Sequence, residues 1–326
     1  MSSPSISVVI PVKNEAGTIR ACIEGVLHQS IAVDEIVVID SGSTDGTLEI
    51  LGEYATIKTI SIAPEEFNHG ETRNLGVREA QGEFVALTVG DARPASDQWI
   101  EELLKGFEDE RVAGVCGQQV VPHDLDMNPA EWFRPSSEPQ ITRYRFPDPE
   151  AFQALSPREK KQACSWDDVT AMYRREVLLE HPFPRVAYGE DIRWARKTLL
   201  AGHELVYNPA ARVYHYHERS FDYTFKRTLT TCYHRYQVMG VVASLPSLKE
   251  TLLPFYILLR EDRVSVLETL KWALYNVRIR AGIWWGVSTF RRALQQGDDA
   301  LRTVHEAHCG VPPTPRRADA APSQSA

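Results

Sequence analysis

The sequence predicts an α/β fold: a doubly wound, mostly parallel sheet followed by a helical C-terminal extension. Three observations predict it. Strand-like and helix-like segments alternate over the N-terminal part, the strands are continuous apolar runs, and the chain from about residue 221 is helical in pattern and rich in aromatic residues and arginines. Alternation implies parallel pairing through crossover helices, and strands that are apolar throughout imply a sheet covered on both faces.

The strands are expected in segments that are rich in β-branched and aliphatic residues. Pro11 is expected to end the first of them. The four segments are 6–10, 35–40, 57–62 and 83–89.

Helices are expected between these strands. Apolar residues from Ile19 to Leu27 recur at i, i+3, i+4, i+7 and i+8, which is one stripe of a helix. A second helix is expected from about Thr44, with Ser43 or Thr44 as its cap. A third covers 69–82 and is closed by Gly82.

Bulk composition excludes several classes of function. The formal net charge of -8 argues against a general nucleic-acid binder, which needs a basic face. Five cysteines without a C-x-x-C pair fit neither a zinc site nor a disulfide framework, and they favour a reducing compartment. We find no signal-peptide pattern and no apolar run of about 18 residues, so we expect a cytoplasmic chain without a spanning helix.

Polar residues follow three of the expected strands: PVKNE the first, DSGSTDGT the second and TVGDARP the fourth. Ligands of open α/β sheets bind beyond the carboxyl ends of strands. A nucleotide fits here, because the Asp40 carboxylate can accept a hydrogen bond from N3–H of uracil or thymine. No G-x-x-x-x-G-K-[ST] and no G-x-G-x-x-G after the first strand occurs, which disfavours an NTPase or an NAD enzyme.

Several motifs together resemble the inverting family 2 glycosyltransferases of the GT-A fold. They are SVVIPVKNE, VVIDSGSTDGT, LTVGDARP and YGEDIRWARKTLLAGHELVYNPAARVYHYH, and FNHGETRNLG resembles the rhamnosyltransferase branch. The resemblance spans residues 5 to about 220. It implies a catalytic domain over 1–220, with a donor-binding half over about 1–120 and an acceptor-binding half over about 121–220. A helical extension over 221–310 and a disordered tail over 311–326 would follow.

The resemblance implies a binding site for a nucleotide-diphospho-sugar donor. Asp40 would contact the base, and Arg73 would reach the base or the diphosphate. Other residues implied to bind the donor are Pro11, Val12, Asn14, Glu15, Ser43 and Asp91.

A divalent metal, Mn²⁺ or Mg²⁺, is the cofactor that the resemblance implies. Asp91 corresponds to the metal-binding aspartate of the D-x-D signature, and His215 or His217 to a late histidine that completes the site. The signature departs from the usual pattern because Val89 and Gly90 precede Asp91, which leaves one carboxylate. A cation would offset the charge that builds on the leaving phosphate.

On the acceptor side, the resemblance assigns Asp191 in GED as the general base. A carboxylate within hydrogen-bond reach of a sugar hydroxyl takes its proton in the transition state, and direct attack inverts the anomeric centre. Trp166, Asp168 and Glu190 are expected to contact the acceptor, a saccharide or a lipid-linked saccharide.

Structural alternatives stay open for these residues. Asp40 and Asp45 can be a strand end and a helix cap, Asp91 can belong to a plain turn, and the two histidines and Trp166 can be structural. The C-terminal helices can pack on the catalytic domain, form a homodimer interface or lie on the inner face of the cytoplasmic membrane.

The function predicted is transfer of a sugar, with rhamnose as the first choice, from a dTDP- or UDP-sugar during surface polysaccharide assembly. One alternative is a nucleotide-sugar-binding scaffold that has lost catalysis. A sugar nucleotidylyltransferase is disfavoured, because it needs a Gly-rich loop with Arg and Lys after the first strand, and PVKNEAGT is not one.

Overall fold

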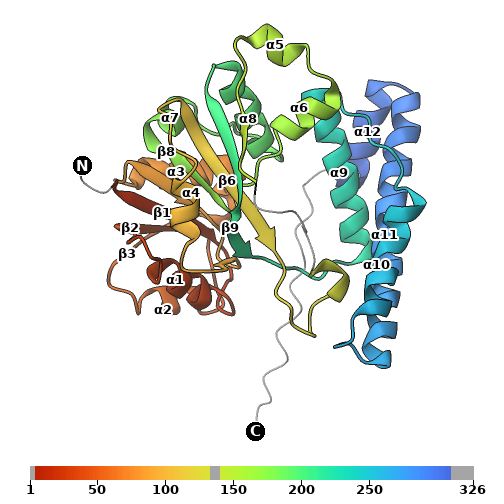
Figure 1. Cartoon of the computed structure of the whole chain (residues 1–326), viewed down its shortest axis with the longest axis horizontal. Helices are drawn as coiled ribbons and strands as arrows, with labels where there is room; N and C mark the ends of the chain where they lie inside the picture. Colours follow the sequence, from red (N-terminus) through yellow and green to blue (C-terminus); the bar gives the residue numbers. More distant parts are fainter. Residues whose placement is uncertain (1–3, 133–139, 310–326) are drawn as a thin grey trace. The chain divides into compact units, whose positions relative to one another are not determined.

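The computed structural model describes residues 4–132 and 140–309, and these residues form two compact units (Figure 1). Residues 4–120 and 140–215 belong to the first unit, and residues 121–132 and 216–309 to the second. The segment after residue 120 therefore belongs with the C-terminal helices. The predicted tail, 311–326, lies outside the described residues.

A sheet of nine described strands forms the first unit, in the order β3-β2-β1-β4-β8-β6-β9-β5, with β7 also paired to β9. Strands β1, β2, β3, β4, β6 and β9 run in one direction, and β5, β7 and β8 run in the other. The bounds are β1 Ile6–Val12, β2 Glu35–Asp40, β3 Ile57–Ser61, β4 Phe84–Leu87, β5 Arg93–Pro94, β6 Val112–Val120, β7 Thr142–Tyr144, β8 Ala171–Arg174 and β9 Glu204–Tyr214.

Helices connect these strands, as the alternating pattern predicts. The first one buries Ile19, Cys22, Ile23 and Val26 of the predicted stripe, whereas Leu27, the last residue of that stripe, is exposed. The helices of this unit are α1 Ile19–Leu27, α2 Thr47–Leu51, η1 Pro64–Glu66, α3 His69–Glu79, α4 Trp99–Leu104, α5 Pro149–Gln153, α6 Pro157–Ala163, α7 Arg175–Glu180 and α8 Glu190–Leu200.

Pro11 does not end the first strand, because β1 continues to Val12. The oxygen of Val9 accepts from Thr88 on the β4 side, and the oxygen of Val12 accepts from Ser41 on the β2 side. Successive residues thus face alternate neighbours, and Pro11 faces the β4 side beyond the last paired residue of β4. No ladder hydrogen bond is lost there, so proline is tolerated.

The predicted start of the second helix is also wrong. Helix α2 begins at Thr47 behind Gly46, whose φ of 94° is left-handed. The Ser43 hydroxyl instead accepts from the backbone N–H of Asn14, so it is not a cap. Helix α3 ends at Glu79, before the predicted Gly82.

The second unit is helical. Its elements are η2 Pro129–Glu131, α9 Phe221–Met239, α10 Leu248–Arg260, α11 Val266–Gln295 and α12 Asp298–Cys309. Two glycines of α11 permit close packing on α9: a Cβ on Gly286 would lie 2.9 Å from the carbonyl oxygen of Phe225, and one on Gly282 would lie 3.0 Å from Phe221. Among the described helices, none has a stretch long and apolar enough to span a bilayer.

Candidate active site

The carboxyl ends of β1, β2, β4, β6 and β9 lie at one edge of the sheet, since these strands run in the same direction. Val12 and Asp40 are paired in the β1–β2 register. A Cβ on Gly90, after β4, would lie 2.8 Å from Glu15 Cγ and 3.0 Å from Val12. The three polar strand ends expected to converge do so.

Asp40 is buried and closes the turn that follows β2. Its carboxylate accepts from the backbone N–H groups of Gly42 at 3.0 Å and Ser43 at 3.1 Å. Farther along, Asp45 Oδ1 accepts from the Thr47 backbone and hydroxyl, at 3.2 and 2.5 Å. The strand-end alternative is thus realised for Asp40, and Asp45 bonds to the first residue of α2 from the position before the N-cap. In Asp40, Oδ2 accepts from both N–H groups, whereas Oδ1 accepts from Ser43 alone and keeps a second lone pair, so the turn does not conflict with a ligand contact at Oδ1.

The loop after β1 is joined to the loop after β2 by side-chain hydrogen bonds. Asn14, with a left-handed φ of 56°, donates its backbone N–H to Ser43 Oγ and accepts from the Thr44 N–H, both at 2.8 Å. Glu15 donates its N–H to Thr47 Oγ1 at 2.7 Å. These bonds fix the two loops to each other, and they place Asn14, Glu15 and Ser43, which were predicted to bind the donor, along one rim.

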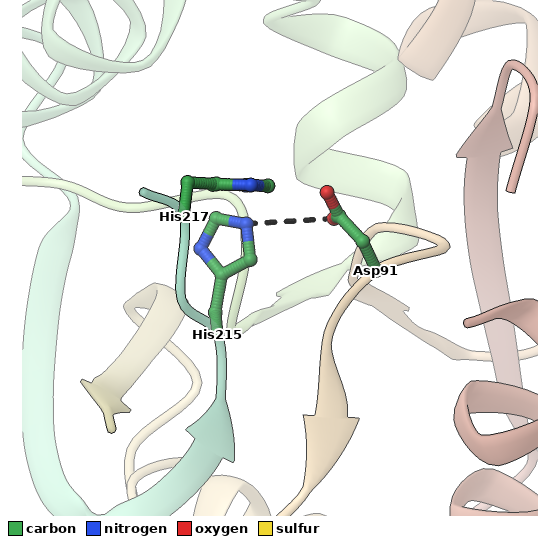
Figure 2. Close-up of side chains that lie close together, drawn as sticks. All are labelled: Asp91, His215 and His217. Atoms are coloured by element: carbon green, nitrogen blue, oxygen red, sulfur yellow. Dashed lines mark ion pairs between the residues drawn. The ribbon is translucent and has the colours of Figure 1, made fainter. Parts of the chain in front are cut away.

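Asp91 and His215 are brought together by a short antiparallel ladder. Arg93 of β5 pairs with Tyr214 of β9, so the residues just before β5 lie beside those just after β9. Asp91 Oδ1 is 3.4 Å from His215 Nε2, and both side chains are largely buried. One ligand atom from each of Asp91, His215 and His217 lies within 4.8 Å of the others, and Figure 2 shows the three side chains gathered together.

The hydrogen bonds that Gln119 makes determine which ring nitrogen of His215 carries the proton and which presents a lone pair. Gln119 Nε2 donates to Asp167 Oδ2 at 2.6 Å, because a carboxylate can only accept. The Gln119 oxygen therefore faces His215 Nδ1, 2.7 Å away, and that nitrogen carries the proton. In the neutral ring Nε2 then presents its lone pair toward the Asp91 carboxylate.

This arrangement fits a divalent cation. When Nε2 of His215 carries no proton, it and Asp91 Oδ1 are two acceptors 3.4 Å apart, and a cation bound to both offsets their repulsion. Metal-bound histidines commonly donate their second N–H to an oxygen, as His215 does to Gln119. One carboxylate with two imidazoles suits Mn²⁺ better than Mg²⁺, which prefers oxygen ligands alone.

A second group of charges surrounds Arg73, whose side chain is 7% exposed. Its guanidinium is 2.9 Å from Glu190 and 3.6 Å from Asp168, and it also donates to the carbonyl oxygen of His69 at 3.0 Å. The prediction placed Arg73 with the donor. The structure instead pairs it with two carboxylates that were predicted to contact the acceptor.

Burial raises carboxyl pKa values in this group, and neighbouring carboxylates add to the effect. Burial raises the pKa of Asp168 to about 7, with Glu190 adding to the effect and Arg73 opposing it. Burial also raises the pKa of Asp191 well above its ordinary value, and the carboxylates of Glu190 and Asp168 raise it further. For Arg73, burial lowers the pKa of the guanidinium, but the carboxylates more than offset this.

Asp191 lies in the first turn of α8, behind Gly189. Its Oδ1 accepts the backbone N–H of Ile192 at 2.7 Å, and its side chain is partly exposed. The helix fixes its position, and a raised pKa makes its carboxylate a stronger base. This combination suits removal of a proton from a hydroxyl.

Trp166 is a core residue. It is 6% exposed and packs against Tyr173 and Trp194, and its indole N–H donates to the Tyr173 hydroxyl at 2.6 Å. That hydroxyl in turn donates to Asp168. The structural alternative for Trp166 is therefore the one realised, and the residue bears on the site through Tyr173.

Gln119, Asp167 and Tyr173 were missed in the sequence. Gln119 nevertheless carries a signal that could have found it, because QQ ends the apolar run of β6 just as polar residues end β1, β2 and β4. Asp167 carries no such signal, since its partner Gln119 lies 48 positions away. Tyr173 lies within the buried strand β8, where a tyrosine fits the apolar pattern.

Comparison with known proteins agrees with this geometry. The model of the family Glycosyl transferase family 2 matches residues 7–180. The chain is similar to the O-antigen chain rhamnosyltransferase WbaN of Salmonella anatum, with 32% identity over 237 residues, 70% of this chain and 71% of the relative. It is also 29% identical to the O-antigen chain rhamnosyltransferase RfbN of Salmonella typhimurium, over 69% of this chain and 71% of the relative.

The fold is similar to that of a solved glycosyltransferase. The mannosyltransferase PcManGT of Pyrobaculum calidifontis, in complex with GDP-Man and Mn²⁺, aligns with a TM-score of 0.56 and 16% identity over 91% of this chain and 89% of that one. The likeness identifies the fold as GT-A. Together with the family model and the two rhamnosyltransferases, it gives the conclusion that the chain belongs to glycosyl transferase family 2.

Proposed function

We propose that this chain is an inverting, metal-assisted glycosyltransferase. It moves a sugar, with rhamnose as first choice, from a dTDP- or UDP-sugar to a hydroxyl of a saccharide or lipid-linked saccharide in surface polysaccharide assembly. The observation that carries the proposal is the shared edge of the sheet, where the loops after β1, β2 and β4 meet and the Asp91–His215 pair lies.

The donor binds along this edge in the proposal. Asp40 accepts N3–H of the pyrimidine through the lone pair that its turn leaves available on Oδ1. Val12, Asn14 and Glu15 line the same rim, with Pro11 at the end of β1 and Ser43 in the turn after β2. The choice of rhamnose follows from the two rhamnosyltransferases to which the chain is similar.

Asp91, His215 and His217 are the residues that would hold a divalent cation in the proposal. When bound, such a cation offsets the negative charge of the leaving diphosphate. Gln119 and Asp167 hold the His215 ring so that Nε2 points toward Asp91.

Asp191 acts as the general base in the proposal. Burial raises its pKa and the carboxylates of Glu190 and Asp168 raise it further, while Arg73 fixes these two carboxylates in place. Asp191 takes the proton of the acceptor hydroxyl while that oxygen attacks the anomeric carbon from the face opposite the diphosphate, so no covalent intermediate forms. Because the pKa of Asp191 is raised, the rate should fall as pH drops through it.

Two measurements test the proposal. Calorimetry with UDP, dTDP and GDP, each with and without Mn²⁺, should show metal-dependent binding of one pyrimidine diphosphate. The matching sugar nucleotides, including dTDP-rhamnose, are then assayed for transfer to lipid-linked saccharides. In this assay Asp191→Asn should lower kcat by about 10²- to 10⁴-fold while diphosphate binding stays unchanged.

Each alternative outcome has a definite meaning. Transfer that survives Asp191→Asn rejects Asp191 as the base. Binding without transfer for every donor favours the scaffold that has lost catalysis. Asp97→Asn, which removes an exposed carboxylate, is the matched control and should leave kcat unchanged.

A further inference from the structure

The longest helix of the second unit is apolar on two opposite sides. Helix α11 buries Trp272, Tyr275, Ile279 and Phe290 against other helices of its unit. On the other side it exposes an apolar stripe: Leu267, Leu270, Leu274, Val277, Trp284 and Trp285. The first four are spaced three or four residues apart, so they lie along one line of the helix. Leu267 is 81% and Trp285 59% exposed.

Helix α10 carries a second exposed apolar line. Leu252, Tyr256 and Leu259 recur at i, i+4 and i+7, and Leu259 is 79% exposed. The opposite side of α10 is anchored, because Leu258 is buried in one cluster with Trp272 and Tyr275 of α11. An ordinary surface helix presents polar residues to water. Both helices therefore have an outer face suited to an apolar environment.

Basic side chains border these lines. At 100° per residue, Lys271 and Arg278 lie along one edge of the α11 stripe and Arg280 along the other. Residues 248–295 contain eight lysines and arginines but four acids, whereas the whole chain has a net charge of -8. Three of those acids are used locally: Glu250 and Glu268 in capping boxes and Glu261 in an ion pair with Arg263.

We propose that the outer face of α10 and α11 binds the surface of an anionic lipid bilayer. Leucine and tryptophan side chains would enter the boundary between headgroups and acyl chains, and the bordering lysines and arginines would contact lipid phosphates. Charge complementarity selects this occupant. In a symmetric dimer the same basic face would meet itself, with like charges opposed. The inference does not depend on the proposed reaction.

The test uses the full chain in a flotation assay with two kinds of vesicle. One is phosphatidylcholine alone, and the other contains phosphatidylglycerol as well. We expect binding to the anionic vesicles, weak binding to the neutral ones, and a decrease with added NaCl. The double variant Leu270→Glu/Leu274→Glu should bind at least about tenfold more weakly, because it removes apolar burial and adds repulsion.

A charge variant and two matched controls complete the design. Lys271→Glu/Arg278→Glu should also weaken binding at least about tenfold. Leu125→Glu replaces an exposed leucine outside the stripe, and Arg158→Glu an exposed arginine of α6, and neither should change binding. Circular dichroism establishes that each variant is folded.

Two results would overturn the proposal. One is that the wild-type protein does not float with anionic vesicles, or that the leucine and charge variants float with them as well as the wild type does. The other is a dimer in sedimentation velocity that Leu270→Glu/Leu274→Glu dissociates, without vesicle binding by the wild type. That result would assign the face to a second copy of the chain.

Discussion

In the loop that follows β2, Asp40 and Asp45 accept hydrogen bonds from N–H groups two or three residues away, with one more to Asp45 from Ala16, whereas the Arg73 cluster joins side chains 117 positions apart. The loops are held by many hydrogen bonds in which at most one partner is charged, and loss of one bond leaves the others intact. The cluster concentrates several charges in a buried volume, so loss of its cation leaves carboxylates unpaired. Local bonds should therefore yield small effects when changed, and the cluster large ones.

The largest expected effect in this comparison comes from Arg73→Met. It leaves Glu190 and Asp168 without their cation in a buried position, which typically costs about 3–5 kcal/mol. Urea unfolding measures it. Arg78→Met, an exposed arginine of the same helix, is the control and should change stability by less than about 0.5 kcal/mol. If both substitutions lowered the free energy of unfolding equally, the buried charge cluster would contribute no more to stability than an exposed arginine does.

Gln119→Leu should have the next largest effect. It removes the acceptor that fixes the proton on His215 Nδ1, and loss of such a partner typically lowers metal affinity about 10- to 100-fold. Mn²⁺ titration followed by electron paramagnetic resonance measures this without turnover. Gln118→Leu is the control, because the Gln118 amide donates to the Tyr207 hydroxyl instead. Unchanged Mn²⁺ affinity in Gln119→Leu would show that the ring needs no such support.

Asp168 makes stability depend on pH. Its folded pKa of about 7 exceeds the unfolded value near 3.9, so the folded state holds more protons between these values and the free energy of unfolding falls as pH rises from about 4 to 7. In Asp168→Asn the side chain does not titrate, so this fall in the free energy of unfolding is absent. The stability of this variant relative to the wild type should rise by up to about 1 kcal/mol per pH unit in this window and then level off. If urea unfolding gave the same difference in free energy between Asp168→Asn and the wild type at every pH in this range, Asp168 would not be the group responsible.

The smallest effect is expected from Asp45→Ala. Burial opposes the change, but hydrogen bonds from Thr47 and Ala16 leave the pKa of Asp45 below its ordinary value, so its contribution is present above the unfolded pKa and lost as pH falls through the folded one. Loss of a similar cap typically costs about 0.5–2 kcal/mol. Urea unfolding at neutral pH measures it. A loss as large as that of Arg73→Met would mean that the loops are as sensitive as the cluster.

The same comparison explains what the sequence could predict. The strands β1 to β4 and helix α1 follow from local apolar patterns, and the polar strand ends follow from the direction of parallel strands. The start of α2 could not be predicted from a cap motif, because the hydroxyl of Ser43 bonds to Asn14 across the loops. Likewise, Arg73 could not be assigned to Asp168 and Glu190, because that pairing depends on how α3 packs near α8.

Strand β5 has two residues, yet it determines where length changes can be tolerated. Arg93 pairs with Tyr214, and this register brings Asp91 to within 3.4 Å of His215. A residue inserted between Asp91 and Arg93 would separate the carboxylate from the imidazole, whereas an insertion in the connection between β7 and α5 leaves that register untouched. Chimeras that exchange loops to change sugar specificity should therefore keep the segment from Asp91 to Pro94 at its present length.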